Sequence, residues 1–129
     1  MVFGVFDTLH EGHRHFLREA KKQGDFLVAV VARDHVVRSL KDQEPMQNEQ
    51  VRFRMLSDEG LADVVVLGDE EQGSWLIFKK YQPDVIAFGY DQSALEESLS
   101  QSGIAEGIFF VRIGAHEPHR FKSSLFRKK

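Results

Sequence analysis

The sequence of 129 residues contains no cysteine, which excludes disulfides, thiolate zinc sites and a cysteine nucleophile. Its formal charge is only -3, so it lacks the broad positive field that attracts nucleic acid. It contains no stretch like a signal peptide and no apolar run of membrane-spanning length. We therefore expect a cytoplasmic protein whose partner is a small molecule, with neither nucleic acid nor a membrane involved.

The hydrophobic content of 42% is sufficient for a packed core, and the length suits one domain over residues 1–129. Apolar runs predict strands at residues 1–6, 26–32, 64–67, 84–89 and 108–112. Helical patterns follow these runs at residues 12–22, 48–60, 74–81, 94–102 and 123–129. This alternation predicts an α/β fold, a Rossmann-like open parallel sheet with helices on both faces. Such sheets bind ligands beyond the carboxyl ends of their strands.

The turn between the first predicted strand and helix, FGVFDTLHEGH at residues 3–13, has the composition of an anion site. The first N–H groups of a helix carry partial positive charge, and Gly12 lets the backbone approach an anion closely. His10 and His13 can direct imidazole N–H donors at the same oxygens. We interpret the turn as a phosphate site, although it matches neither the P-loop nor the glycine-rich dinucleotide pattern.

Two other interpretations of these histidines are open. A pair of histidines three residues apart can bind a metal, but a third ligand at a suitable spacing is missing, and His15 is expected to point away from His13 on a helix. We therefore predict no metal-ligating residues. A histidine pair without further context is usually an ordinary surface feature. The preceding residues 4–7, GVFD, favour the phosphate site over both alternatives.

Residues 4–13, GVFDTLHEGH, resemble the G-T-F-D-x-x-H-x-G-H signature of the HIGH-motif nucleotidyltransferase superfamily, the cytidylyltransferase-like group, with Val5 in place of the more common threonine. Later segments follow the family order. They are most similar to archaeal-type FAD synthetases and next to glycerol-3-phosphate cytidylyltransferases. The resemblance implies a HUP-type nucleotidyltransferase fold and transfer of a nucleoside monophosphate from ATP or CTP to a phosphorylated small molecule, with release of pyrophosphate.

The resemblance also assigns roles to individual residues. His10 and His13 would stabilise the α-phosphate and the leaving pyrophosphate, and Lys41 would add positive charge. The nucleotide-binding residues that it implies are Gly4, Val5, Phe6, Gly12, Arg52, Gly89, Asp91, Ser123 and Ser124. Each of these residues also has an ordinary structural interpretation that does not depend on the family. Ser123 and Ser124 could be simple helix caps, and Gly89 and Asp91 could form a turn. Lys41 and Arg52 could be solvated surface charges.

The expected reaction needs no protein nucleophile, because an acceptor phosphate is already ionised at neutral pH. Mg²⁺ is expected to bridge the triphosphate, and a homodimer is expected because related proteins are often dimers. FMN with ATP is the favoured substrate pair, and glycerol 3-phosphate with CTP is the main alternative. The family often has a second lysine where this chain has Gln43 and Glu44. Lys41 would therefore have to supply the main positive charge, unless Arg38, Arg112 or Arg120 contributes. The same departure leaves open a non-catalytic nucleotide-binding module.

Overall fold

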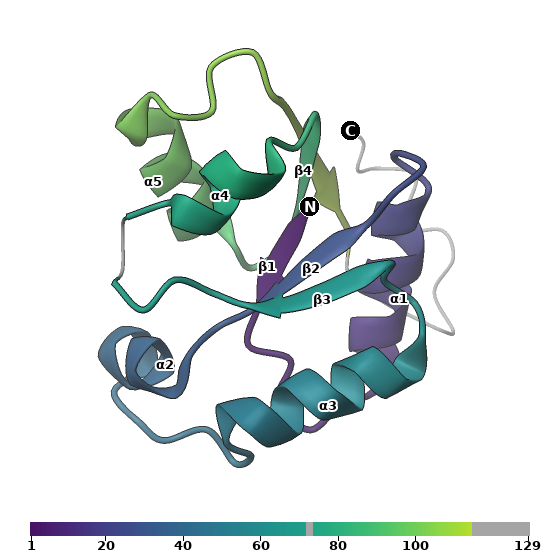
Figure 1. Cartoon of the computed structure of the whole chain (residues 1–129), viewed down its shortest axis with the longest axis vertical. Helices are drawn as coiled ribbons and strands as arrows, with labels where there is room; N and C mark the ends of the chain where they lie inside the picture. The colour runs from purple at the N-terminus through teal and green to yellow at the C-terminus, as the bar shows by residue number, and fades with distance from the viewer. Residues whose placement is uncertain (72–73, 115–129) are drawn as a thin grey trace.

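The computed structural model describes residues 1–71 and 74–114 (Figure 1). In chain order, the elements are β1 (Val2–Gly4), α1 (Glu11–Lys21), β2 (Val28–Val31), α2 (Asp34–Lys41), α3 (Glu49–Glu59), β3 (Val64–Leu67), α4 (Leu76–Tyr81), β4 (Val85–Gly89), α5 (Ser93–Ser102) and β5 (Phe109–Ile113). The predicted strands and the first four predicted helices are confirmed. The helix predicted over residues 123–129 lies outside the described residues. No helix in the described part of the chain is long and apolar enough to cross a membrane.

The strands form the predicted parallel arrangement. Strands β1, β2 and β3 are neighbours in that order, and β4 pairs with β5. Two hydrogen bonds join Met1, the residue before β1, to β4: the Met1 amine donates to the Val85 carbonyl at 2.9 Å, and the Ala87 N–H donates to the Met1 carbonyl at 3.1 Å. The strand order is therefore β3-β2-β1-β4-β5, and the direction of winding changes between β1 and β4 (Figure 1). Ligands of open α/β sheets bind at the carboxyl end of this switch point.

Apolar side chains cover both faces of the sheet. All four residues of β2 are buried, and neighbouring residues of a strand point to opposite faces. Ala29 and Val31 pack in one core with α1 and α3, whereas Val28 and Val30 pack in a second core with α4 and α5. This two-sided burial explains why the strand sequences are continuous apolar runs.

The sequence pattern does not predict α2, and a tertiary contact explains why this helix forms. Its N-cap residue, Arg33, makes no side-chain capping hydrogen bond. Instead, the Asp34 N–H donates to Glu49 Oε1 at 2.8 Å, and Glu49 belongs to the first turn of α3. The group that stabilises the start of α2 is thus 15 residues away in the sequence. Local propensity alone could not identify it.

Helix α3 begins and ends as predicted. Asn48 Oδ1 accepts an N–H from the first turn at 2.9 Å, and Gly60 follows the last turn with φ 72°. The buried side of α3 contains Leu56, as an amphipathic helix requires, but Met55 is exposed and Arg52 is completely buried. A charged residue thus lies where the pattern calls for an apolar one. Its partners belong to the candidate site.

Candidate active site

The candidate site begins with the turn that leaves β1 and enters α1. Phe6 and Thr8 have positive φ angles of 55° and 47°, a conformation that costs about 1–3 kcal/mol per non-glycine residue. The Phe6 ring lies over Gly4, where an added Cβ would be 2.9 Å from two ring carbons. Gly4 is therefore required for the packing of Phe6. The strained turn redirects the chain toward the two histidines.

His10 and His13 form a reciprocal cap at the start of α1. The Gly12 N–H donates to His10 Nδ1 at 3.0 Å, and the His10 N–H donates to His13 Nδ1 at 3.2 Å. The two rings are stacked with centroids 3.9 Å apart. Because each Nδ1 accepts a hydrogen bond, the neutral rings carry their hydrogen on Nε2. The site thus offers two adjacent imidazole donors at a helix N-terminus, an arrangement suited to phosphate oxygens.

Gly12 makes room for the His10 ring. A Cβ at this position would lie 2.8 Å from His10 Cε1 and 3.1 Å from His10 Nδ1. The sequence interpretation assigned this glycine to close approach of the backbone and an anion, and the structure adds a second reason. A side chain here would displace the ring that caps the helix.

His13 is neutral at physiological pH. Burial of the imidazole is the largest cause that lowers its pKa, to about 4, and positive charge on His10 and Arg14 acts in the same direction. The carboxylates of Asp7 and Asp91 oppose this shift but do not reverse it. His13 can therefore donate a hydrogen bond to a phosphate but brings no positive charge of its own.

The low pKa of His13 predicts a loss of stability in acid. An unfolded chain protonates this histidine below about pH 6.5, whereas the folded protein resists protonation until about pH 4. The free energy of unfolding should therefore decrease as the pH falls through this window. Urea titrations at about pH 7, 5.5 and 4.5 would compare the protein with His13→Asn, which should lack this part of the decrease. Equal pH dependence in both proteins would contradict the assignment.

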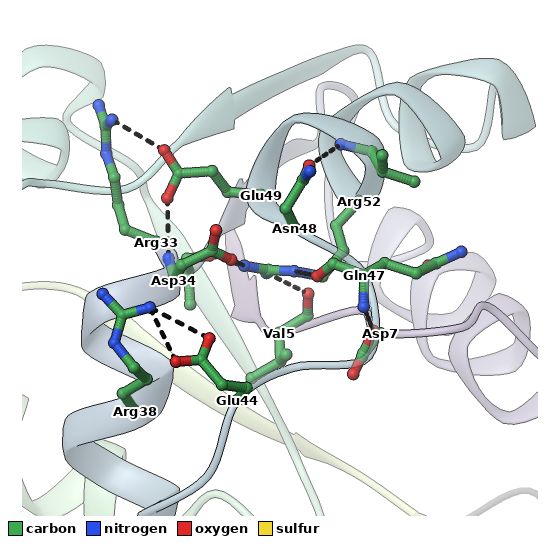
Figure 2. A network of polar contacts seen from close by, with 12 residues as sticks. Val5, Asp7, Arg33, Asp34, Arg38, Glu44, Gln47, Asn48, Glu49 and Arg52 are labelled. Atoms are coloured by element: carbon green, nitrogen blue, oxygen red, sulfur yellow. Dashed lines mark hydrogen bonds and ion pairs between the residues drawn. The ribbon is translucent and has the colours of Figure 1, made fainter.

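A loop before α3 fixes the strained turn. The Asp7 carboxylate accepts the N–H groups of Met46 and Gln47 at 2.7 and 3.0 Å, and the Thr8 N–H donates to Gln47 Oε1 at 3.0 Å. Figure 2 shows the Asp7 carboxylate beside the Gln47 backbone. Several hydrogen bonds thus hold the chain around Asp7 in one conformation, and such support is what allows a strained backbone to persist. Both oxygens of the Asp7 carboxylate therefore accept hydrogen bonds from the protein backbone.

Arg52 is placed differently from the expectation. The family resemblance implies a nucleotide-binding residue here, but the Arg52 side chain is 0% exposed and its guanidinium donates to protein oxygens. Nε donates to the Gln47 carbonyl at 2.9 Å, Nη1 to the Val5 and Ala32 carbonyls at 2.9 and 2.8 Å, and Nη2 to Asp34 Oδ1 at 2.6 Å. Four of its five N–H groups are thus used within the protein. This burial does not agree with direct contact between Arg52 and a phosphate.

The carboxyl end of β4 supplies Gly89 and Asp91. The Asp91 side chain is exposed, and its Oδ1 would be 3.3 Å from a Cβ at Gly89. Its charge acts on the pKa of His13, so this loop and the histidine turn share one site. Sequence reasoning missed the contribution of Gln92, which accepts the Gly89 N–H at 2.8 Å and donates to the Phe3 carbonyl at 2.7 Å. Its amide ties β4 to β1 at the switch point.

The comparisons with known proteins agree with this geometry. Residues 1–129 match the family described as cytidylyltransferase-like. The chain belongs to this family. A curated FAD synthase of Thermoplasma acidophilum is 39% identical, over 100% of this chain and 91% of the relative, and a FAD synthase of Thermococcus sibiricus is 40% identical, over 95% and 81%. These matches confirm the family resemblance of residues 4–13. They also show that the protein is an enzyme of the nucleotidyltransferase type.

A solved structure supports the same family. It is titled as a lipopolysaccharide core biosynthesis protein of Thermoplasma volcanium. The TM-score is 0.81 at 38% sequence identity, and the match covers 91% of this chain and 96% of the other. The cytidylyltransferase-like fold, with its parallel sheet between helices, therefore describes the whole arrangement around the histidine turn.

The basic residues expected to supply positive charge to a phosphate differ in whether a carboxylate already binds them. Lys41 is exposed at the end of α2. Arg38 donates to both carboxylate oxygens of Glu44 at 3.1 and 3.3 Å, and Arg112 makes two hydrogen bonds to Glu96 at 2.9 and 2.6 Å. The two alternative cations that lie within the described residues are thus paired with carboxylates, which leaves Lys41 as the better candidate among the three. Outside the described residues lie Arg120, Ser123 and Ser124.

The described residues fit a metal that arrives with a substrate. Within residues 1–71 and 74–114, no group of three or more histidine, cysteine or acidic side chains could hold a metal ion. Mg²⁺ usually keeps several waters and binds through one or two carboxylates together with substrate phosphates. The exposed Asp91 is one carboxylate in the site that such an ion could use. A complete protein cage is not required.

Proposed function

We propose that the protein transfers the adenylyl group of ATP to FMN, forming FAD and pyrophosphate. The observation that supports this most directly is the stacked pair of His10 and His13, which presents two Nε2–H donors at the N-terminus of α1. The curated relatives named FAD synthase support the choice of FMN and ATP. We further propose that residues 1–129 act as a single domain, in the cytoplasm and as a homodimer.

In the proposed reaction, an oxygen of the FMN phosphate attacks the α-phosphorus of ATP. A new P–O bond forms as the bond from the α-phosphorus to the bridging oxygen breaks, and the electron pair leaves with pyrophosphate. No proton needs to be removed, because the attacking phosphate is ionised. His10 and His13 donate hydrogen bonds to oxygens on which negative charge increases, and Lys41 adds charge that neutral His13 lacks.

The nucleotide would lie across the switch point. We propose that Gly4, Val5, Phe6 and Gly12 shape the turn around its phosphates, and that ribose and base lie beside Gly89 and Asp91. Mg²⁺ bound to the triphosphate would neutralise the β- and γ-phosphates and orient the leaving group. Ser123 and Ser124 are proposed to contact the terminal phosphates.

The proposal is tested by measuring pyrophosphate release with Mg²⁺, crossing ATP and CTP with FMN and glycerol 3-phosphate. We expect pyrophosphate release only in the pairing of ATP with FMN, where FAD is formed at the same time. The His13→Asn variant should lose this signal. Release with CTP and glycerol 3-phosphate alone would replace the proposed function with the cytidylyltransferase alternative. Nucleotide binding without release in any pairing would favour a binding module, for which the Arg38–Glu44 pair is the motivating observation.

A further inference from the structure

We propose that Arg52 is a positioning residue that holds the histidine turn in its active conformation through the carbonyl oxygens of Val5 and Ala32. The proposal rests on the role proposed above for His10 and His13 in phosphoryl chemistry. It assigns Arg52 no contact with the nucleotide. It also predicts which property of the site changes when the guanidinium is removed.

Arg52 acts at the place where β1 and β2 separate. Their paired register ends at Gly4 opposite Val31, and the Ala32 N–H then donates to the Gly4 carbonyl at 2.9 Å. The next carbonyls, those of Val5 and Ala32, both accept from Nη1 of Arg52. A buried carbonyl without a partner costs free energy, so the guanidinium compensates for the end of the strand pairing.

The same guanidinium also donates to two further segments, α2 and the loop before α3. Nη2 donates to Asp34 in α2, and Nε donates to the Gln47 carbonyl in the loop that binds Asp7. Glu49 accepts from both the Asp34 N–H and Arg33, which fixes the start of α2 to α3 (Figure 2). Arg52 is therefore a rigid link between four segments. A planar guanidinium suits this geometry because its donors are fixed in direction.

The Val5 carbonyl connects Arg52 to the histidine turn. Val5 precedes Phe6, whose φ of 55° is strained, and the Phe6 ring meets the His13 ring edge to face at a centroid distance of 5.8 Å. If the Val5 carbonyl loses its donor, Phe6 can relax to an ordinary backbone conformation, and its ring no longer packs against His13. The imidazole of His13, which is half-buried in this structure, then becomes more exposed to water. The histidine turn would lose both its geometry and its low-dielectric environment.

The test compares Arg52→Lys with the matched control Arg54→Lys, an exposed position two residues further along the same helix. A lysine retains the charge but cannot supply the four directed donors. The first measurement is an NMR titration of the imidazole C–H signals, which needs neither FMN nor turnover. We expect the pKa of His13 to rise in Arg52→Lys from about 4 toward the ordinary value of 6.5, and to stay low in Arg54→Lys.

The second measurement separates kcat from nucleotide affinity. We expect kcat to fall about 10- to 100-fold in Arg52→Lys, because small displacements of catalytic groups have effects of this size, while the Kd for ATP changes less than about threefold. A large loss of ATP affinity with an unchanged His13 pKa would overturn the proposal in favour of direct phosphate contact. Lower thermal stability with both His13 pKa and kcat unchanged would overturn it in favour of a merely structural role.

Asp34→Asn keeps the test decisive should Arg52→Lys not fold. It leaves the three carbonyl partners of Arg52 intact and keeps an oxygen that can accept from Nη2, so that only the negative charge of the fourth partner is removed. The expected result is the same direction of change in His13 pKa and kcat, with smaller amplitude. An unchanged pKa and kcat in Asp34→Asn would count against the proposal. Because the titration does not depend on the acceptor, failure of the FMN reaction would leave this inference separately testable.

Discussion

His13→Asn should lower kcat about 10²- to 10³-fold while the protein remains folded, the loss typical of removing one preorganised donor from a transition state. Asparagine is the informative replacement, because its side-chain oxygen can take the place of Nδ1 and accept the His10 N–H. It has no group that corresponds to Nε2–H. The same reasoning applies to His10→Asn, whose oxygen can accept the Gly12 N–H. Alanine would remove the cap together with the donor, at a cost of about 1 kcal/mol.

Single-turnover measurement of FAD formation would report the chemical step directly. Far-UV circular dichroism and the Tm of each variant would show that the helix cap is retained. Lys80→Ala, on the exposed side of α4, is a suitable control for which we expect unchanged kcat. If His13→Asn turned over at the rate of the unchanged protein, the proposed role of the histidine pair would be wrong.

Gly12→Ala is expected to separate activity from stability. Glycine to alanine within a helix normally stabilises by about 1 kcal/mol. Here the new Cβ would lie 2.8 Å from His10 Cε1, so the ring must leave its capping position, which costs about the same amount. The two effects nearly cancel in the free energy of unfolding. The displaced His10 ring no longer directs its Nε2–H donor at the phosphate, so kcat should fall about 100-fold.

Gly24→Ala provides the matched comparison. No heavy atom lies within 4 Å of a Cβ built at Gly24, and this residue has no positive φ. We expect kcat of Gly24→Ala to equal that of the unchanged protein. Chemical denaturation and steady-state kinetics of both variants would complete the test. A Gly12→Ala variant with full activity would show that the position of the His10 ring is unimportant for the reaction.

Much of the fold could be predicted because its signals are local. The continuous apolar run of β2 reflects burial on both faces, and Asn48 and Gly60 mark the ends of α3 by their own backbone and side-chain preferences. The histidine turn is also local, since His10 and His13 cap the helix in which they lie. Helix α2 could not be predicted in this way, because Glu49 of another helix accepts its first N–H group, that of Asp34.

The roles of several polar and charged side chains depended on contacts that the sequence pattern does not reveal. Arg52 resembles a phosphate ligand in sequence, but the ends of β1 and β2 enclose it and use its donors. Arg38 resembles a spare cation, but Glu44 neutralises it. Gln92 carries no distinctive local signal, although its amide joins β4 to β1. The carbonyl partners of Arg52 and the Phe3 partner of Gln92 are fixed by tertiary packing, which a pattern of neighbouring residues does not contain. Arg38 and Glu44 are only six residues apart, but their pairing depends on the course of the loop after α2.

The sequence by itself determined the alternation of strands and helices, the parallel sheet and the chemistry of the turn at residues 4–13. Each of these follows from periodicity, capping or residue type within a short stretch of chain. Only the tertiary structure decided that His13 is neutral, that Arg52 is internal and that Lys41 is the more available cation. The reason is physical: burial and charge pairing are properties of surroundings, and these surroundings come from residues far apart in the sequence.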